Sequence, residues 1–573
     1  MSRMLRRVVM SLLLAAIAVA LVRESPWHYD KSPLCFELYA SPEKLDLGGD
    51  VVVSWTNLQA DPADYVTISC GPTTAADDYI QLINVTSTSL SSVRFEDLHM
   101  LRCVYVASYF HFNGSAYSLL GQISIPMKDA IESPQQGHLA LNDEIDQMVI
   151  MYNSASDRTP SVKYGRDPAL ASDVHTRRGT STTYAASDMC HAPATIVAQQ
   201  WFRDPGFMHT IVMDELTLAT TYYYQFGNDV DGWSAIYSFQ SRPPVDSTAP
   251  VKFIAYGDMG VDNAPAAWST AMRVYQDVRD GYDAFLLHFG DVSYARGIGL
   301  QWDKYFYVIQ DYATRLPYMV SVGNRTSIFR ALMCHGDAFA SDEYDYMGGG
   351  VHDPSQPDTP NGFHPSWGNY GTDSLGECAV PMFHRFTGPA NGHGLFWYSF
   401  DYAMVHVIQL SSEHDFLPGS AQYKWLEADL ARLNRTAHPW VVVTAHRMMY
   451  TTQLDEVEDY MVSVHFRDAV EPLLTRHRVN LVLVGHQHSY ERSCPVFKGR
   501  CVDQGTVHIV AGSAGAELER SGFSSALGNW SVAHVNAWGY LRLEATIEAL
   551  AVSFVRNDNG NVYDQTTLRP WLA

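Results

Sequence analysis

Five short apolar runs in the second half of the chain each end in a side chain that could bind a metal ion. Each run has the length of a buried strand, and the glycine or alanine at its end allows a sharp turn. The side chains at these strand ends are carboxylates, imidazoles, a carboxamide and a phenol: Asp258, Asp291, Tyr294, Asn324, His446, His486 and His488. Ligands of open α/β folds bind where strands end. The sequence therefore predicts that these groups gather at one edge of a sheet.

None of these motifs is specific when taken alone. A Gly-Asp pair after a strand is most often a turn, and asparagine after glycine, as at Asn324, is a common turn residue. A histidine pair at a turn is commonly structural, and Tyr294 could be a packed aromatic among the 33 tyrosines. The prediction gains its weight from repetition, because five separate strands end in ligand side chains.

Together the motifs resemble those of the purple acid phosphatases, a group within the metallophosphoesterases. The family pattern is GDxG, GDxxY, GNH(D/E), VxxH and GHxH. In this chain it reads GDMG at 257–260, GDVSY at 290–294, GN at 323–324, VTAH at 443–446 and GHQH at 485–488. The tyrosine of the second motif separates purple acid phosphatases from most of their relatives. The resemblance covers roughly residues 135–570.

The resemblance implies a binuclear metal centre in which Asp291 is the natural shared ligand. Asp258, Tyr294 and His488 would complete one metal site, and Asn324, His446 and His486 the other. A phenolate and carboxylates suit a trivalent ion, whereas imidazoles and a neutral amide suit a divalent one. The expected cofactors are therefore Fe(III) together with Fe(II), Zn(II) or Mn(II). In this chemistry a hydroxide generated by the metals attacks the phosphorus of a phosphomonoester in line.

The third motif departs from the family pattern. The family reads Gly-Asn-His-Glu or Asp, and its histidine is a proposed general acid or phosphate contact. Here Arg325 follows Asn324, and residues 325–342 stand where a single histidine is expected. Two interpretations are open. The segment is a gene-model artefact or a diverged copy, in which case protonation of the leaving group is impaired. Alternatively, it is a real loop from which His335 or His352 acts as the general acid. Its apolar part at 328–333 favours the first interpretation.

Loss of that segment would also remove Cys334 and leave an odd number of cysteines. Arg296 could help to hold the substrate phosphate, although a surface arginine is the commoner explanation. The leading hypothesis is an acid phosphatase that acts on small phosphorylated substrates. The alternatives are a nucleotide pyrophosphatase or phosphodiesterase of the same fold, and a catalytically impaired glycoprotein that keeps the fold.

The elements around the motifs predict a multidomain chain. After a Pro-rich linker at 241–250, strands alternate with helical patterns at 264–280, 302–316, 421–433 and 464–477. Such alternation is typical of an α/β domain, and the resemblance makes it a metallophosphoesterase domain with a β-sandwich flanked by helices. We place this domain at 251–512, closed by C-terminal strands at 534–570.

The N-terminal half has short alternating strands with frequent turn residues, which predict fibronectin-like or Ig-like β-sandwich modules at 35–126 and 135–243. The second resembles the fibronectin-like N-terminal domain of the large purple acid phosphatases, in phrases such as PSVKYG at 160–165. Neither module has ligand spacing, so packing and solubility are the expected roles. We interpret His191 and His209 as ordinary loop or strand histidines.

The N-terminus and the composition indicate export. Residues 1–22 combine three arginines, a short apolar run and an A-x-A-like site, which favours a secretory signal peptide over an uncleaved anchor. The net charge of −23 argues against nucleic-acid binding and against anionic membranes, so membrane association would require that anchor.

Eight cysteines suit an oxidising compartment, and Cys494 and Cys501 are expected to form a disulfide. Four sequons, at Asn84, Asn113, Asn434 and Asn529, are possible glycan sites. We expect a secreted or lysosome-like vesicular protein.

Overall fold

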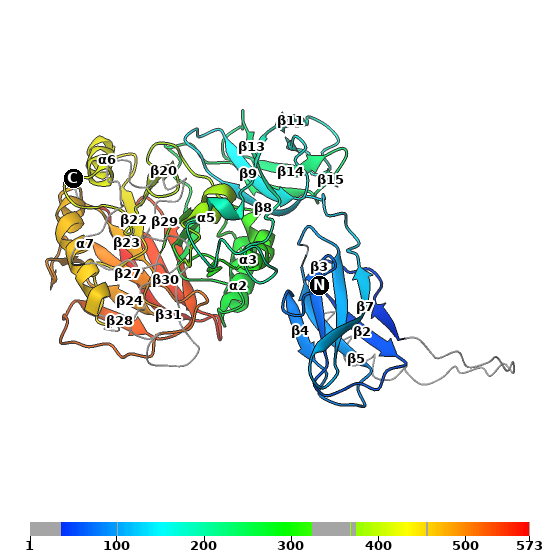
Figure 1. The fold of residues 1–573 in the computed structure, drawn as a ribbon. Coiled ribbons are helices and arrows are strands. Elements are labelled where there is room, and N and C mark those ends of the chain that lie inside the picture. The colour runs from blue at the N-terminus through cyan, green and yellow to red at the C-terminus, as the bar shows by residue number, and fades with distance from the viewer. Residues whose placement is uncertain (1–35, 100, 324–366, 368–373, 454–456, 572–573) are drawn as a thin grey trace, which may run out of the picture.

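The computed structural model describes residues 36–99, 101–323, 367, 374–453 and 457–571. Figure 1 shows two β-modules beside a larger domain in which helices flank stacked sheets. The predicted architecture, β-sandwich modules followed by a domain in which helices flank a β-sandwich, is confirmed. The predicted signal peptide at 1–22, together with Asn324, His335 and His352, lies outside the described residues.

The first module consists of two antiparallel sheets. One contains β1 (Glu37–Ser41), β2 (Gly49–Thr56) and β5 (Ser92–Leu98). The other contains β4 (Gln81–Asn84), β3 (Tyr65–Cys70), β6 (Tyr105–Phe112) and β7 (Tyr117–Ile125). Along β2, Val51, Val53 and Trp55 alternate into the core, as the strand period requires. Trp55 packs edge-on against Tyr109 of the opposite sheet, with ring centroids 4.9 Å apart.

The second module is also a two-sheet sandwich. Its four-stranded sheet runs β12 (Thr180–Thr182), β13 (Phe207–Met213), β9 (Met148–Ser154) and β8 (Gln135–Ala140). Its five-stranded sheet runs β11 (His175–Arg178), β10 (Ser161–Gly165), β14 (Thr221–Asn228) and β15 (Gly232–Trp233), with β16 (Tyr237–Gln240) also paired to β14. A short 3₁₀ helix, η2, spans Ala186–Asp188.

The largest domain stacks a six-stranded sheet on a seven-stranded sheet. The first runs β19 (Tyr318–Ser321), β18 (Leu286–Phe289), β17 (Val251–Tyr256), β29 (Gly539–Ala545), β30 (Leu550–Arg556) and β31 (Val562–Leu568). The second runs β20 (Tyr398–Tyr402), β21 (Val405–Gln409), β22 (Trp440–Ala445), β23 (Leu481–Val484), β27 (Val507–Ala511), β24 (Tyr490–Ser493) and β28 (Ser531–Val535). A hairpin, β25 (Val496–Phe497) and β26 (Arg500–Cys501), lies beside them.

Helices cover the outer faces of the two sheets. Figure 1 shows α6 (Ala421–Arg432) and α7 (Val457–Arg476) on one side, and α2 (Ala267–Arg279) and α3 (Gly299–Ala313) on the opposite side. A shorter helix, α5, spans Val380–Arg385. The predicted helices are confirmed, although α7 begins at Val457 rather than at residue 464. Among the described residues, no helix combines the length and apolar character needed to cross a membrane.

The central strands are buried on both faces, which explains why they read as continuous apolar runs. In β17, Phe253 and Ala255 face the core between the sheets, whereas Ile254 and Tyr256 pack with the helical layer. Strands β17, β18 and β19 are parallel, as are β21, β22, β23 and β27. Parallel strands end at a common edge, so the loops that follow them meet.

Three disulfides stabilise the described chain. The predicted Cys494–Cys501 bridge is confirmed and closes the β25–β26 hairpin. Cys70–Cys103 lies within the first module, and Cys190–Cys378 connects the second module to the largest domain.

Candidate metal centre

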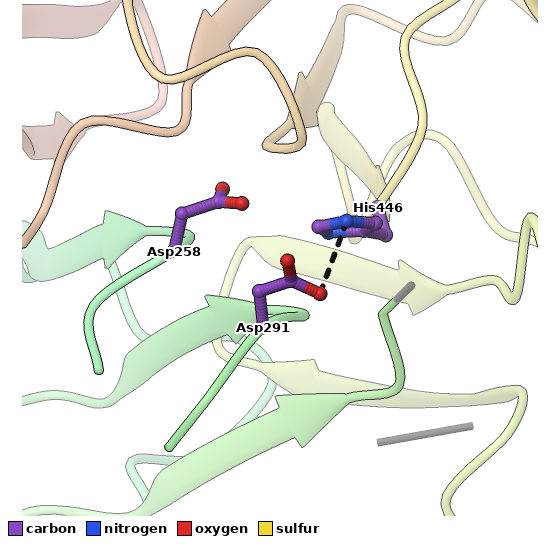
Figure 2. Close-up of side chains that lie close together, drawn as sticks. All are labelled: Asp258, Asp291 and His446. Carbon is purple, nitrogen blue, oxygen red and sulfur yellow. Dashed lines mark ion pairs between the residues drawn. The ribbon is translucent and has the colours of Figure 1, made fainter. Parts of the chain in front are cut away.

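The loops after β17, β18, β22 and β23 bring the predicted ligands together. Figure 2 shows the carboxylates of Asp258 and Asp291, from one sheet, and the imidazole of His446, from the other, converging on one space. Ligand atoms of these three residues lie within 4.8 Å of one another, and all three side chains are buried. The sequence-predicted edge therefore contains a compact set of oxygen and nitrogen donors.

The six described ligands form two groups of contacts. In the first, the Tyr294 hydroxyl oxygen lies 2.8 Å from His488 Nε2 and donates to Asp258 Oδ1 at 3.3 Å. In the second, His446 Nε2 lies 3.2 Å from Asp291 Oδ1, and 3.3 Å from His486 Nδ1. The groups also touch each other, because the His486 backbone N–H donates to Asp258 Oδ2 at 2.9 Å. The division of these ligands between two metal sites stays a prediction from the family resemblance.

The backbone at this edge is strained. Asp258, Asp291, Tyr294 and His486 all have positive φ, at 61°, 52°, 54° and 69°. Such angles are unfavourable for residues other than glycine, and they persist where the surrounding structure enforces them. Strained residues of this kind concentrate at functional sites, and here four of them belong to the predicted ligands.

Hydrogen bonds fix the orientation of two imidazoles. His446 Nδ1 lies 3.1 Å from the carbonyl oxygen of Phe289, and His488 Nδ1 lies 2.7 Å from that of Glu517. Because a carbonyl only accepts, each Nδ1 must donate, and Nε2 keeps the lone pair of the neutral ring. Burial lowers the pKa of His446, which favours this neutral form. Both rings therefore have the tautomer and orientation that allow Nε2 to bind a metal.

The residues present fit a binuclear centre. A Cβ at Gly485 would lie 2.3 Å from Asp258 Oδ2, and a Cβ at Gly290, where φ is 89°, would lie 2.4 Å from His446 Nδ1. Only glycine therefore permits these close approaches. Two buried carboxylates this near to each other are unfavourable without cations, and the combined oxygen and imidazole donors suit iron, zinc and manganese.

The other predicted residues have different positions. Arg296 is half-buried in the Tyr294 loop, with φ at 55°, rather than fully on the surface. His209 is an ordinary buried strand histidine, as predicted, with its ring nitrogens 2.9 and 2.7 Å from the hydroxyls of Ser154 and Ser181. His191 Nδ1 bonds to the carbonyl oxygen of Ala192.

The sequence reasoning missed one buried ion pair at this edge. Glu413 lies in the loop after β21, and its carboxylate oxygens lie 3.0 and 3.1 Å from Nε of Arg447, the residue after His446. Burial raises the pKa of Glu413, and the neighbouring Arg447 and His446 oppose that rise. The signal was present, because the apolar strand Val405–Gln409 also ends in polar residues, but Ser-Ser-Glu-His matches no familiar ligand motif.

Three family models match consecutive parts of the chain. They are the N-terminal domain of purple acid phosphatase at residues 134–241, the calcineurin-like phosphoesterase at 251–490, and the iron/zinc purple acid phosphatase-like protein C at 505–565. Among solved structures, the purple acid phosphatase PPD1 from yellow lupin seeds has the same fold. Its TM-score is 0.77 at 24% identity, over 93% of this chain and 96% of that one.

Two curated plant relatives give further comparisons. A protein of Arabidopsis thaliana named probable inactive purple acid phosphatase 9 is 30% identical over 584 residues, which cover 91% of this chain and 84% of that protein. A nucleotide pyrophosphatase/phosphodiesterase of Hordeum vulgare is 29% identical over 359 residues, which cover 59% of this chain and 88% of that protein. With its motifs, its fold and a relative that matches along most of both chains, this chain belongs to the purple acid phosphatase family.

Proposed function

We propose that this protein is a secreted acid phosphatase that hydrolyses small phosphomonoesters at a centre of Fe(III) and a divalent ion. The observation that carries the proposal is the convergence of Asp258, Asp291 and His446 within 4.8 Å, at the ends of strands from two sheets. When bound, two metal ions would neutralise the phosphate oxygens and activate water as the nucleophile. The family model named for iron and zinc supports that choice of metals.

The residues of the chain would divide the tasks. Asp291 would be the shared ligand, Asp258, Tyr294 and His488 would hold the trivalent ion, and His446 and His486, with Asn324, the divalent one. Local cations are needed because the net charge of −23 repels anionic substrates. Arg296, in the same loop as Tyr294, is a further candidate to contact the substrate phosphate. The signal-like N-terminus and the three disulfides support secretion.

Two other functions have specific support. The barley relative's name favours a nucleotide pyrophosphatase or phosphodiesterase. The names of four Arabidopsis relatives, each called probable inactive, favour an impaired enzyme, as does the absence of a histidine directly after Asn324. In the phosphatase proposal, His335 would supply the proton to the leaving group.

The deciding experiment uses the full chain expressed through a secretory route. We would record metal content and the visible spectrum, and compare hydrolysis of a chromogenic monoester, its bis-ester and ATP at pH 5. A tyrosinate-to-Fe(III) band with fastest monoester turnover supports the phosphatase, and faster ATP or bis-ester turnover supports the alternative enzyme. Colour and two metals without turnover indicate the impaired form. A protein without metal contradicts the ligand assignment.

The same preparation tests the third motif. Peptide sequencing of the native protein across residues 320–350 shows whether Asn324 is joined to Arg325. A His335→Ala variant that keeps full turnover would exclude this histidine as the acid. The Asp291→Asn variant is the matched negative control for turnover, because it removes the proposed shared ligand.

A further inference from the structure

Glu413 and Arg447 form a fully buried ion pair next to a proposed metal ligand. Their side chains are 0% and 1% exposed, and Arg447 follows His446 directly in the chain. Ser412 completes the arrangement, because its hydroxyl donates to Glu413 Oε1 at 2.9 Å and accepts from the Arg447 backbone N–H at 2.8 Å. The loop after β21 is thereby fixed to the loop that contains His446.

The pair is not needed to join these two strands. β21 and β22 are already paired in parallel register, with Ile408 opposite Val443 and Gln409 opposite Thr444. The Thr444 hydroxyl also donates to the Gln409 side chain at 2.7 Å. A buried ion pair carries a large desolvation penalty, and apolar residues of similar size often replace one without loss of stability. Its presence at this position therefore indicates a role other than strand pairing.

Arg447 lies next to the proposed metal ligand His446 in the chain, and this position suggests an electrostatic role for the pair. A guanidinium buried one residue from a metal-binding imidazole would repel a divalent ion, and the repulsion is strong where water is excluded. Glu413 cancels that charge while Ser412 orients the backbone. We propose that Glu413 and Arg447 are positioning residues that act on the divalent site at His446 through their charges, with Glu413 balancing the charge of Arg447. This inference rests on the proposed metal centre.

The two partners should have opposite effects on metal affinity. Glu413→Gln removes the carboxylate that binds Arg447 Nε and so makes the charge beside His446 more positive. Divalent binding should therefore weaken about tenfold or more, in line with outer-shell substitutions at other metal sites. Arg447→Met leaves a carboxylate near the metal, so binding should be at least as tight as in the wild type. Glu413→Met combined with Arg447→Met removes both charges and should bind within about threefold of the wild type. A purely structural pair would weaken binding in all three variants.

The control is an ion pair outside the centre whose carboxylate is buried and whose arginine is 28% exposed. Asp277 is buried, and Arg542 Nη2 donates to its Oδ1 at 2.6 Å. Neither residue has a contact with a candidate ligand among the interactions of the described chain. Asp277→Asn and Arg542→Met should lower the melting temperature of the metal-free protein and leave metal affinity unchanged.

The experiment titrates the full-length, metal-depleted protein with Zn²⁺ alone, and then with Mn²⁺, by calorimetry. The melting temperature of the metal-free variants and the tyrosinate-to-Fe(III) band of iron-loaded samples are recorded in parallel. Weaker divalent binding in Glu413→Gln alone, with the band retained, supports the inference. Equal affinities in Glu413→Gln and the wild type, or equal weakening in Arg447→Met, overturn it while the metal centre stands. A wild type that binds neither ion overturns the proposed function and this inference together.

Discussion

Arg102 of the first module and Asp303 of α3 form a buried salt bridge between two domains. The guanidinium is bidentate, with Nη1–Oδ1 at 2.6 Å and Nη2–Oδ2 at 2.9 Å, and the side chains are only 4% and 1% exposed. Gln136 of the second module also donates to Asp303 Oδ1, at 2.7 Å. One carboxylate therefore binds both modules to the helix that follows the Tyr294 loop.

Loss of Arg102 should loosen this junction. Burial would raise the pKa of Asp303, but Arg102 lowers it, so Arg102→Met leaves a buried carboxylate without its cation. Removal of one partner of such a pair costs about 3–5 kcal/mol. We expect a lower unfolding temperature and faster protease cleavage between the first module and the rest of the chain, measured by calorimetry and limited proteolysis.

Arg94 of the same module supplies the control for that change. It pairs with Asp50 at the surface, where the two side chains are 57% and 32% exposed. Exposed pairs contribute about 0–1 kcal/mol, so Arg94→Met should hardly change stability. Equal effects of the two substitutions would show that the Arg102 pair does not hold the domains together.

Asp291→Asn should separate metal binding from stability. Asp258 and Asp291 are both fully buried and close together, so the metal-free protein carries unfavourable repulsion between carboxylates. The amide removes that repulsion and also the proposed shared ligand. We expect a higher melting temperature without metal and no further rise on adding Zn²⁺, whereas the wild type should be stabilised by metal. A wild-type-like rise in the variant would exclude Asp291 as a shared ligand.

Tyr294→Phe should remove the visible colour without unfolding the site. Phenylalanine keeps the ring that packs at 7% exposure but removes the hydroxyl beside His488 and Asp258. We expect loss of the tyrosinate-to-Fe(III) band in the absorption spectrum of iron-loaded protein. Tyr305→Phe is the control, because Tyr305 is equally internal but its hydroxyl faces His288. An unchanged spectrum in Tyr294→Phe would mean that another group is the chromophore.

The sequence was sufficient to predict which strand ends meet, because that signal is local. A buried parallel strand reads as an apolar run, and the residue after it lies at the sheet edge, so the strand pattern alone groups Asp258, Asp291 and His446. The orientation of the rings could not be predicted, because the acceptor of His488 Nδ1 is a carbonyl at Glu517, which has no sequence signature.

The pairing of strands that are far apart in the chain also could not be predicted from the sequence. β29 lies against β17 in the six-stranded sheet, with Leu543 opposite Phe253, although the two strands are far apart in the chain. Periodicity identifies such strands but not their neighbours. The bridge between Arg102 and Asp303 is hidden for the same reason, since a charged residue on a predicted helix is usually expected at the surface.

His406 on β21 lies between two carboxylates. Its Nδ1 is 2.6 Å from Asp401 Oδ1, and its Nε2 is 2.9 Å from Asp429 Oδ2. Burial by itself would lower the pKa of His406, but the hydrogen bonds to Asp401 and Asp429 outweigh it and raise the pKa to about 8. The histidine is therefore charged in the folded protein at a pH where it is neutral in the unfolded chain.

This shift gives the largest domain a defined pH dependence. Because the folded pKa lies above the unfolded value of about 6.5, the stabilisation, about 2 kcal/mol, is complete below pH 6.5 and is lost as the pH rises through about 8. In denaturant unfolding of the metal-free protein, the wild type should therefore lose stability between about pH 6.5 and 8 relative to His406→Gln. His508→Gln is the matched control, since burial lowers the pKa of His508 to about 3 and leaves it neutral throughout this range. Parallel pH profiles of the wild type and His406→Gln would show that the two carboxylates do not hold a charged histidine.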